Sequence, residues 1–217
     1  MKYPKYPKYK DSGIEWIGEI PKHWKIEKIK FVADVIMGQS PPSETYTENG
    51  IIPFLQGCAE FGKLSPIPTH YCDIASKLSL PGDILFSVRA PVGEMNISDV
   101  TYGIGRGLCS IRASNFDSHY LFWALHAAKT QLFSISRGST YDAISADDIR
   151  NLAIGFPTTG EEVELISSFL NSMVLKLDLI IATQQQLIEI LKEKRQAIIT
   201  HAVTKGLDPN VPMKDFY

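Results

Sequence analysis

The fold is decided by residues 161–203, which read EEVELISSFLNSMVLKLDLIIATQQQLIEILKEKRQAIITHAV and contain neither glycine nor proline. Because glycine and proline are the residues that most disfavour a helix, the stretch predicts one uninterrupted helix, about 64 Å long at ~1.5 Å per residue. We expect this helix to occupy residues 158–205 and to be followed by a C-terminal tail at 206–217.

Apolar residues recur along the predicted helix at alternating steps of four and three. This row consists of Ile166, Leu170, Met173, Leu177, Ile180, Gln184, Leu187, Leu191, Lys194, Ile198 and His201. The spacing is typical of a coiled-coil seam, so we expect its eight apolar members to form a dimerisation face. A second row, made of Val174, Ile181 and Ile188, indicates another contact surface beside the first. One long helix cannot bury such a seam alone, and the pattern predicts a partner helix.

Residues 10–157 differ from the helix, because glycine and proline interrupt short apolar runs. Such runs predict strands, and we expect them at 51–55, 83–88, 92–97, 107–111 and 152–156. A helix is expected over 117–133, where Leu121, Leu125, Ala128 and Leu132 recur at helical spacing. A capping-box signal, Ser145-Ala-Asp-Asp148, predicts the start of a short second helix. The fold class is therefore α+β, a strand-rich domain followed by one long coiled-coil-forming α-helix.

The first nine residues repeat lysine, tyrosine and proline, ending at Tyr9. Proline at this spacing blocks a helix and favours an extended chain, so residues 1–9 are expected to form a flexible, solvated arm. Contact of this arm with phosphates remains an alternative.

Charge excludes one class of nucleic-acid protein. Lys and Arg total 22 and Asp and Glu total 24, so a net charge of −2 rules out a chain that coats nucleic acid by charge alone. A local basic surface remains possible, since residues 101–141 carry Arg106, Arg112, Lys129 and Arg137 against Asp117 alone.

Cysteine usage and hydropathy indicate a reduced, soluble, cytoplasmic protein. Cys58, Cys72 and Cys109 are widely spaced and form no CxxC pair, so neither a disulfide framework nor a zinc site is indicated. The N-terminus lacks the apolar core of a signal peptide. The most apolar stretch, 174–182, contains Lys176 and Asp178 and is short for a membrane span, so we expect no membrane segment.

Motifs that would make the chain an enzyme are weak. Ser40-Pro41-Pro42-Ser43 resembles an adenine-methyltransferase loop, but Ser43 replaces the aromatic residue that stacks on the base. Gly103-Ile-Gly105-Arg106-Gly107 departs from GxGxxG and leads into a predicted strand, which favours a bulged hairpin with Arg106 facing a ligand. The sequence has no phosphate-binding GxxxxGK[ST] and no metal-ligand spacing, so no catalytic residue and no metal ligand is predicted.

Several loops instead combine glycine or proline with side chains suited to nucleic acid. Gln and Arg can pair with adenine and guanine edges, whereas Ser, Thr and Lys suit phosphates. Two of these loops are Gln56-Gly57 and Gly105-Arg106. The candidate DNA-binding residues are Gln39, Ser40, Lys63, Arg89, Arg106, Arg137, Ser139, Thr140 and Tyr141.

From residue 10 onward the chain resembles the specificity subunit of type I restriction–modification systems. Similar motifs occur in order and spacing at 10–24, at 80–86 (Leu-Pro-Gly-Asp-Ile-Leu-Phe), at 105–108, at 136–140, at 148–157, and at 193–200 and 202–208. The chain departs from the family at its domain exit, usually Pro-Pro-x-x-Glu-Gln, which here is Pro157-Thr158-Thr-Gly-Glu161-Glu162. We expect this change to have little effect beyond the linker.

The chain also differs from the family in its number of recognition domains and conserved helices. The family typically carries two recognition domains and two conserved helices, whereas this chain shows one of each and ends at residues 213–217, which echo 9–13. The sequence fits either a natural half-subunit or half of a longer one.

The resemblance implies a non-catalytic DNA-recognition subunit in which residues 10–157 read one half of a bipartite target in double-stranded DNA. Methyltransferase subunits with S-adenosylmethionine, and a restriction and motor subunit with ATP and Mg²⁺, would be its partners, and the chain itself would hold no cofactor. A half-subunit would form a homodimer through its long helix and read an inverted repeat. The competing hypothesis is a coiled-coil interaction module, or an inhibitor of the restriction complex, that does not read DNA.

Overall fold

The computed structural model describes residues 5–114, 116–136 and 143–208, with the backbone alone described at 133–136. The chain divides into two compact units, Met1–Ser167 and Ser168–Tyr217. The division falls inside the long C-terminal helix, so the first two turns of that helix belong to the globular unit. The domain boundary expected at 157 lies before this point.

A four-stranded antiparallel sheet lies at the centre of the globular unit, in the order β4-β11-β8-β9. Its strands are β4 (Ala33–Met37), β11 (Leu108–Ala113), β8 (Ile84–Ser87) and β9 (Met95–Ile97). Side chains alternate along a strand, so Ile84 and Phe86 of β8 pack into the main core while Leu85 packs into a second, smaller core. The sheet is therefore covered on both faces.

Helices and a further strand pair complete the main core. They are α1 (Ser118–Ala127), α2 (Lys129–Ser136), α3 (Ala146–Asn151), β12 (Ala153–Phe156) and β3 (Lys25–Lys28), with β12 antiparallel to β3. The expected start of α3 is confirmed, since Ser145 and Asp148 form a capping box. Leu121 and Leu125 of α1 and Leu132 of α2 are fully buried in this core.

The single helix expected over 117–133 is wrong, because the structure has α1 and α2 there. Asp117 caps α1 by accepting a hydrogen bond from the backbone N–H of Tyr120 at 2.6 Å. Ala128 ends α1 and is itself fully buried. The break lets both short helices bury apolar residues in one core, and tertiary packing thus overrides the local helical pattern.

A second four-stranded sheet has the order β6-β5-β10-β7, with β5 parallel to β10 and the other pairs antiparallel. Its strands are β6 (His70–Tyr71), β5 (Pro53–Leu55), β10 (Tyr102–Ile104) and β7 (Leu78–Ser79). The smaller core lies between the two sheets and contains Leu55, Leu85, Tyr102, Ile104 and Leu108. Short 3-10 helices occur at η1 (Ile29–Phe31), η2 (Ser43–Thr45) and η3 (Cys58–Glu60).

The strands expected from the sequence are confirmed in β5, β8, β11 and β12, with shifted ends. The expected strand at 92–97 is shorter, because Gly93 adopts a φ of 85° and its N–H bonds to the carbonyl of Ser87 at 2.9 Å, which makes a turn. The hairpin expected at 103–107 is wrong. β10 and β11 belong to different sheets, and residues 105–107 link them.

The N-terminal segment makes specific contacts with the rest of the domain. Residues 1–4 lie outside the described residues, but Tyr9 already pairs with Pro21 where β1 (Tyr9–Asp11) meets β2 (Glu19–Pro21). The hydroxyl of Tyr6 donates to Glu162 Oε1 at 2.6 Å. Residues 5–9 are all exposed, as expected of a solvated arm, and the flexibility of this arm stays a prediction.

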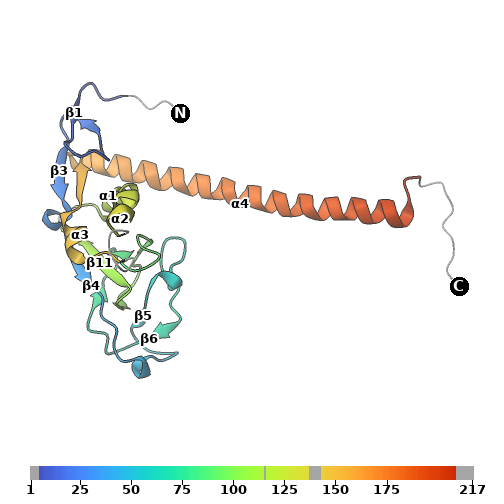
Figure 1. Ribbon diagram of the computed structural model, residues 1–217, viewed down its shortest axis with the longest axis horizontal. Coiled ribbons are helices and arrows are strands. Elements are labelled where there is room, and N and C mark those ends of the chain that lie inside the picture. Colours follow the sequence, from blue (N-terminus) through green and yellow to red (C-terminus); the bar gives the residue numbers. More distant parts are fainter. Residues whose placement is uncertain (1–4, 115, 137–142, 209–217) are drawn as a thin grey trace. The chain divides into compact units, whose positions relative to one another are not determined.

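The long helix, α4 (Gly160–Lys205), is uninterrupted over 46 residues, as the sequence predicts (Figure 1). Within the globular unit Val163 and Ser167 of α4 are buried, and Ile166 packs against the main core. Part of the apolar surface of Ile166 therefore has a partner inside the domain, and its place in the dimerisation face stays a prediction.

The part of α4 from Ser168 onward exposes most of its apolar residues. In the predicted seam Leu170 and Met173 are partly buried, whereas the remaining apolar members are exposed: Leu177, Ile180, Leu187, Leu191 and Ile198. By length and composition alone, α4 also qualifies as a helix that could cross a membrane. The expectation that no stretch is long and apolar enough for this is therefore wrong, because the apolar run extends well beyond 174–182.

Candidate nucleic-acid interface

Three loops from distant parts of the sequence meet between the two sheets of the globular unit. We call them the three-loop cluster, defined as residues 38–40, 56–57 and 105–107. Four hydrogen bonds between backbone atoms hold it, at 2.8 to 3.3 Å: Gly38 N–H to Leu108 O, Gln39 N–H to Ile104 O, Gly105 N–H to Leu55 O, and Gly107 N–H to Gln56 O. Main-chain atoms thus fix the positions of these loops.

Glycine makes this approach possible. A Cβ atom on Gly38 would lie 2.1 Å from the carbonyl oxygen of Gly105, and one on Gly107 would lie 2.7 Å from that of Gln56. Both distances are too short for any side chain, and the obstructing atoms belong to the backbone. The glycines that the sequence places in these loops therefore allow close packing of chain on chain, rather than a dinucleotide fingerprint.

Side chains add a second layer of contacts to the three-loop cluster. Ser40 Oγ accepts hydrogen bonds from the backbone N–H of Arg106 at 3.0 Å and from Gln56 Nε2 at 2.9 Å. The hydroxyl of Tyr46 donates to Gln56 Oε1 at 3.1 Å. The ring of Tyr46 packs on Phe54 with centroids 4.9 Å apart. Ser40 Oγ also lies 3.2 Å from Gln56 Oε1, so it occupies the edge of the amide where nitrogen and oxygen lie side by side, although the residue as a whole is exposed.

The structure brings four of the predicted DNA-binding residues to this cluster. Gln39, Ser40 and Arg106 belong to it, and Gln39 Oε1 accepts a hydrogen bond from Ser76 Oγ at 3.3 Å. Arg89 adjoins it, because the preceding residue, Val88, donates its N–H to Gly107 O at 3.0 Å. Gln39, Arg89 and Arg106 are exposed.

The other predicted residues are not brought there. Lys63 lies on a separate turn, which Gly62 attaches to Asn96 of β9 through an N–H···Oδ1 bond of 3.0 Å. The remaining four, Arg137, Ser139, Thr140 and Tyr141, lie outside the described residues.

Ion pairs reduce the basic surface expected over 101–141. Arg112 pairs with buried Asp83 at 2.7 Å, and Lys129 pairs with Glu94 at 2.7 Å. The hydrogen bond to Asp83 raises the pKa of Arg112. Among the residues the structure describes, the cations near the three-loop cluster that form no salt bridge include Arg89, Arg106 and Lys77. Positive charge there is thus confined to a few side chains.

Sequence reasoning missed Gln56 and Tyr46 as site residues. Gln56-Gly57 follows a buried strand, the same pattern of a polar residue beside glycine that marks the other two loops. That signal was sufficient to find Gln56. Tyr46 carries no such signal, because its position against Gln56 depends on the fold of the η2 turn.

A different cluster lies where α4 begins and centres on Glu162. Besides the hydroxyl of Tyr6, Glu162 Oε1 accepts a hydrogen bond from Trp24 Nε1 at 3.0 Å, and Glu162 Oε2 lies 2.9 Å from His23 Nε2. Glu162 stands where the family usually has Gln, and the expectation that this departure has little effect beyond the linker stays a prediction. Glu162 ties the N-terminal segment to the start of α4.

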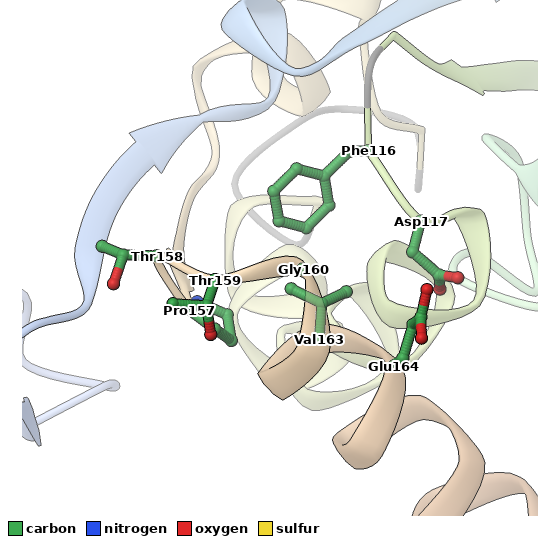
Figure 2. Close-up of a pocket in the computed structure, with 8 residues that line it drawn as sticks. All are labelled: Phe116, Asp117, Pro157, Thr158, Thr159, Gly160, Val163 and Glu164. Carbon is green, nitrogen blue, oxygen red and sulfur yellow. The ribbon is translucent and has the colours of Figure 1, made fainter.

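A pocket of about 500 Å³ opens beside this helix start (Figure 2). Phe116 and Val163 give it an apolar wall, and Asp117 and Glu164 each contribute a carboxylate to its lining. Asp117 Oδ1 already accepts bonds from the N–H of Tyr120 and from Ser167 Oγ. Two carboxylates suit no phosphate, so this pocket is not a second DNA site.

Within the described ranges, no three His, Cys, Asp or Glu side chains gather in a way that could hold a metal ion. The cysteines there are unpaired; Cys72 and Cys109 are buried, and burial raises the pKa of the Cys109 thiol. A buried thiol with a raised pKa is a poor nucleophile.

Comparison with known proteins identifies the class. The model of the type I restriction modification DNA specificity domain matches residues 21–192, more than half of the chain. The protein belongs to this family.

Similar proteins include specificity subunits of type I restriction enzymes. This protein is 38% identical over 151 residues to the putative type I restriction enzyme MjaX specificity subunit of Methanocaldococcus jannaschii, covering 67% of this chain and 36% of that protein. It is 27% identical over 190 residues to the EcoDI specificity subunit of Escherichia coli, covering 88% of this chain and 40% of that protein.

Solved structures agree. The HsdS subunit from Thermoanaerobacter tengcongensis matches with a TM-score of 0.71 and 33% identity, over 92% of this chain and 48% of that one. A chain from a structural study of the assembly and conformational transition of the type I R-M system matches with a TM-score of 0.80 and 36% identity, over 87% of this chain and 47% of that one. The chain thus spans about half the length of these structures, and its α+β fold is that of a specificity subunit.

Proposed function

We propose that this chain is a non-catalytic, sequence-specific DNA-recognition subunit of a type I restriction–modification complex, and that residues 10–157 read one half of a bipartite target. The observation that carries the proposal is the three-loop cluster. It presents Gln39, Gln56 and Arg106, whose side chains suit adenine and guanine edges, on loops fixed by main-chain hydrogen bonds. A rigid scaffold bearing exposed base-reading side chains is what direct readout requires.

The second part of the proposal concerns α4. Apolar residues of the 4-3 seam from Leu177 to Ile198 are exposed, and a coiled coil with a second copy would cover them. We propose a homodimer in which two helices of α4 pair and set the distance between two readers. A helix of 46 residues is about 69 Å long at ~1.5 Å per residue, enough to separate two readers along a duplex.

The third part concerns partners. Methyltransferase subunits would bind S-adenosylmethionine, and a restriction and motor subunit would use ATP with Mg²⁺. The net charge of −2 supports this division, because a reader with few unpaired cations depends on its partners for contacts with phosphate. The assembly would work in the cytoplasm, with α4 pairing with another helix rather than crossing a membrane. Lys192, Glu193, Lys194 and Arg195 in α4 support that choice.

Binding of the full chain to a fluorescently labelled DNA duplex, with and without its methyltransferase subunit, tests the proposal. We expect binding that weakens as salt rises, because cationic side chains displace counterions. Arg106→Ala should weaken binding by about 1–3 kcal/mol and relax the choice of base at one position.

Lys22→Ala is the matched control, since Lys22 is exposed, lies outside the three-loop cluster and carries the same charge. Equal binding of duplex by wild type, Arg106→Ala and Lys22→Ala would contradict the proposed surface. A chain that binds the methyltransferase but never duplex DNA would instead indicate an interaction module.

A further inference from the structure

We propose that Lys77 binds a phosphate of the DNA backbone and thereby fixes where the three-loop cluster lies along the duplex. This inference rests on the proposed function and adds to it a positioning residue that reads no base. The support comes from the segment that carries Lys77, which we define as residues 75–77 and call the Lys77 loop.

The Lys77 loop is attached to the three-loop cluster at two consecutive residues. Ser76 Oγ donates a hydrogen bond to Gln39 Oε1 at 3.3 Å. The carbonyl of Lys77 accepts a hydrogen bond from the backbone N–H of Ile104 at 2.9 Å, and the carbonyl of Ile104 accepts one from the N–H of Gln39. Lys77 is therefore joined to the cluster through its main chain, and its side chain has no part in holding the loops together.

A glycine in β10 allows the Lys77 loop to lie close to that strand. A Cβ atom on Gly103 would lie 2.6 Å from the Cβ atom of Ala75, which is too short for a contact between side chains. Because position 103 carries no side chain, the loop packs directly on β10. This packing fixes the point from which the side chain of Lys77 extends.

The side chain of Lys77 carries a charge that the domain does not neutralise. It is exposed, and within the described residues it forms no salt bridge. Arg112 and Lys129 differ in this respect, since each is paired with a carboxylate. A lysine ammonium is a compact charge with three donors on a flexible stem, and such a group suits the oxygens of a phosphate.

Lys77 also lies at the border of the surface that would read DNA. It directly precedes β7, an edge strand of the sheet β6-β5-β10-β7, whereas Gln39 and Arg106 lie on loops between the two sheets. In a duplex the base edges form the floor of the major groove, and the phosphates line its two rims, about 12 Å apart. With Gln39 and Arg106 directed at the floor, a cation at the border meets a rim. Phosphate contacts of this kind set the register of a protein on DNA.

The decisive change is Lys77→Ala. Each phosphate that a cation neutralises contributes about −0.9 to the slope of log K against log salt. We therefore expect Lys77→Ala to make this slope shallower by about one and to weaken binding about 5- to 10-fold at ~0.1 M salt, equally for every duplex sequence. The main-chain contacts of the loop are kept in the variant, so its melting temperature should stay close to that of wild type.

Two further variants serve as controls. Lys77→Arg keeps the positive charge and should bind with the slope of wild type. Lys22→Ala removes an exposed lysine outside both the three-loop cluster and the Lys77 loop, and it should also leave the slope unchanged.

The experiment measures binding of the full chain, in complex with its methyltransferase subunit, to a duplex of the sequence that wild type selects from a randomised pool. The salt concentration is varied, and each phosphate is replaced in turn by an uncharged methylphosphonate. One replacement should weaken wild-type binding about 5- to 10-fold. The same replacement should weaken Lys77→Ala no further, because that variant has already lost the contact.

The results distinguish this inference from the proposed function. A wild-type chain that selects no sequence overturns the proposed function, and this inference with it. If wild type selects a sequence but Lys77→Ala keeps the wild-type slope and affinity, this inference alone is overturned. The same holds if Lys77→Ala selects a different sequence, because Lys77 would then read a base. It also holds if every methylphosphonate weakens wild type and Lys77→Ala by the same factor.

Discussion

Glu162 connects the start of α4 to three residues near the N-terminus. Its side chain is 14% exposed, and its carboxylate has hydrogen-bond partners in Tyr6, His23 and Trp24, all within the first 24 residues. Burial by itself would raise the pKa of Glu162, but hydrogen bonds from Tyr6, Trp24 and His23 stabilise the charged form and lower it overall. The same contact raises the pKa of Tyr6 to about 12.

Replacement of Glu162 by Ala should therefore lower the free energy of unfolding by about 2 kcal/mol at neutral pH. Because the pKa of Glu162 is lowered in the folded state, its contribution is present above the ordinary value of 4.5 and is lost as pH falls through the folded value. Urea unfolding at pH 7 and at pH 3.5 measures this, with the wild-type advantage shrinking at the lower pH. Glu161→Ala, at an exposed neighbouring position, should change little.

For the three-loop cluster, the sequence could predict individual residues but not how the fold brings them together. Gln39, Ser40 and Arg106 could be chosen because glycine beside a polar residue is a local signal. Their convergence could not, since it depends on β5 pairing with β10 in one sheet and β10 leading into β11 of the other. Arg112 and Asp83 lie far apart in the sequence, so their ion pair could not be predicted from it. The charge of Arg112 was therefore counted as part of an unpaired basic surface.

At the scale of elements, α4 was the most predictable part, because a long stretch without glycine or proline determines its structure locally. The α1–α2 pair was not predictable in the same way. A helical apolar pattern continues through Ala128, yet packing in the main core breaks the helix there. Long-range packing thus determines where α1 and α2 end, whereas local helix propensity determines the length of α4.

The proposed homodimer makes a prediction about α4. Leu187 lies in the seam and is 46% exposed, whereas Leu179 lies off the seam and is 69% exposed. Leu187→Lys should convert a dimer to a monomer, because a buried charge at a seam position is strongly unfavourable. Leu179→Lys should leave the dimer intact. Light scattering after gel filtration gives the masses, and a wild-type chain that remains a monomer at high concentration would refute the seam.

At the scale of the whole molecule, the proposed dimer has two identical readers related by a two-fold axis. Such an arrangement should read an inverted repeat, with the gap between half-sites set by the paired helices. Sequencing of methylated positions in cells that carry this chain and its methyltransferase subunit should reveal such a site. A bipartite site with unlike halves would contradict the dimer while leaving the single reader in place.

Main-chain hydrogen bonds join the three loops that carry Gln39, Gln56 and Arg106, and side-chain bonds of Ser40 add to them. A mutation at any of these positions therefore leaves the four main-chain bonds in place, along with the sheets behind them. Because main-chain bonds hold the loops, the side chains that would contact bases can be substituted while these bonds remain. On the proposed function, single substitutions on these loops would change the recognised bases without rebuilding the fold.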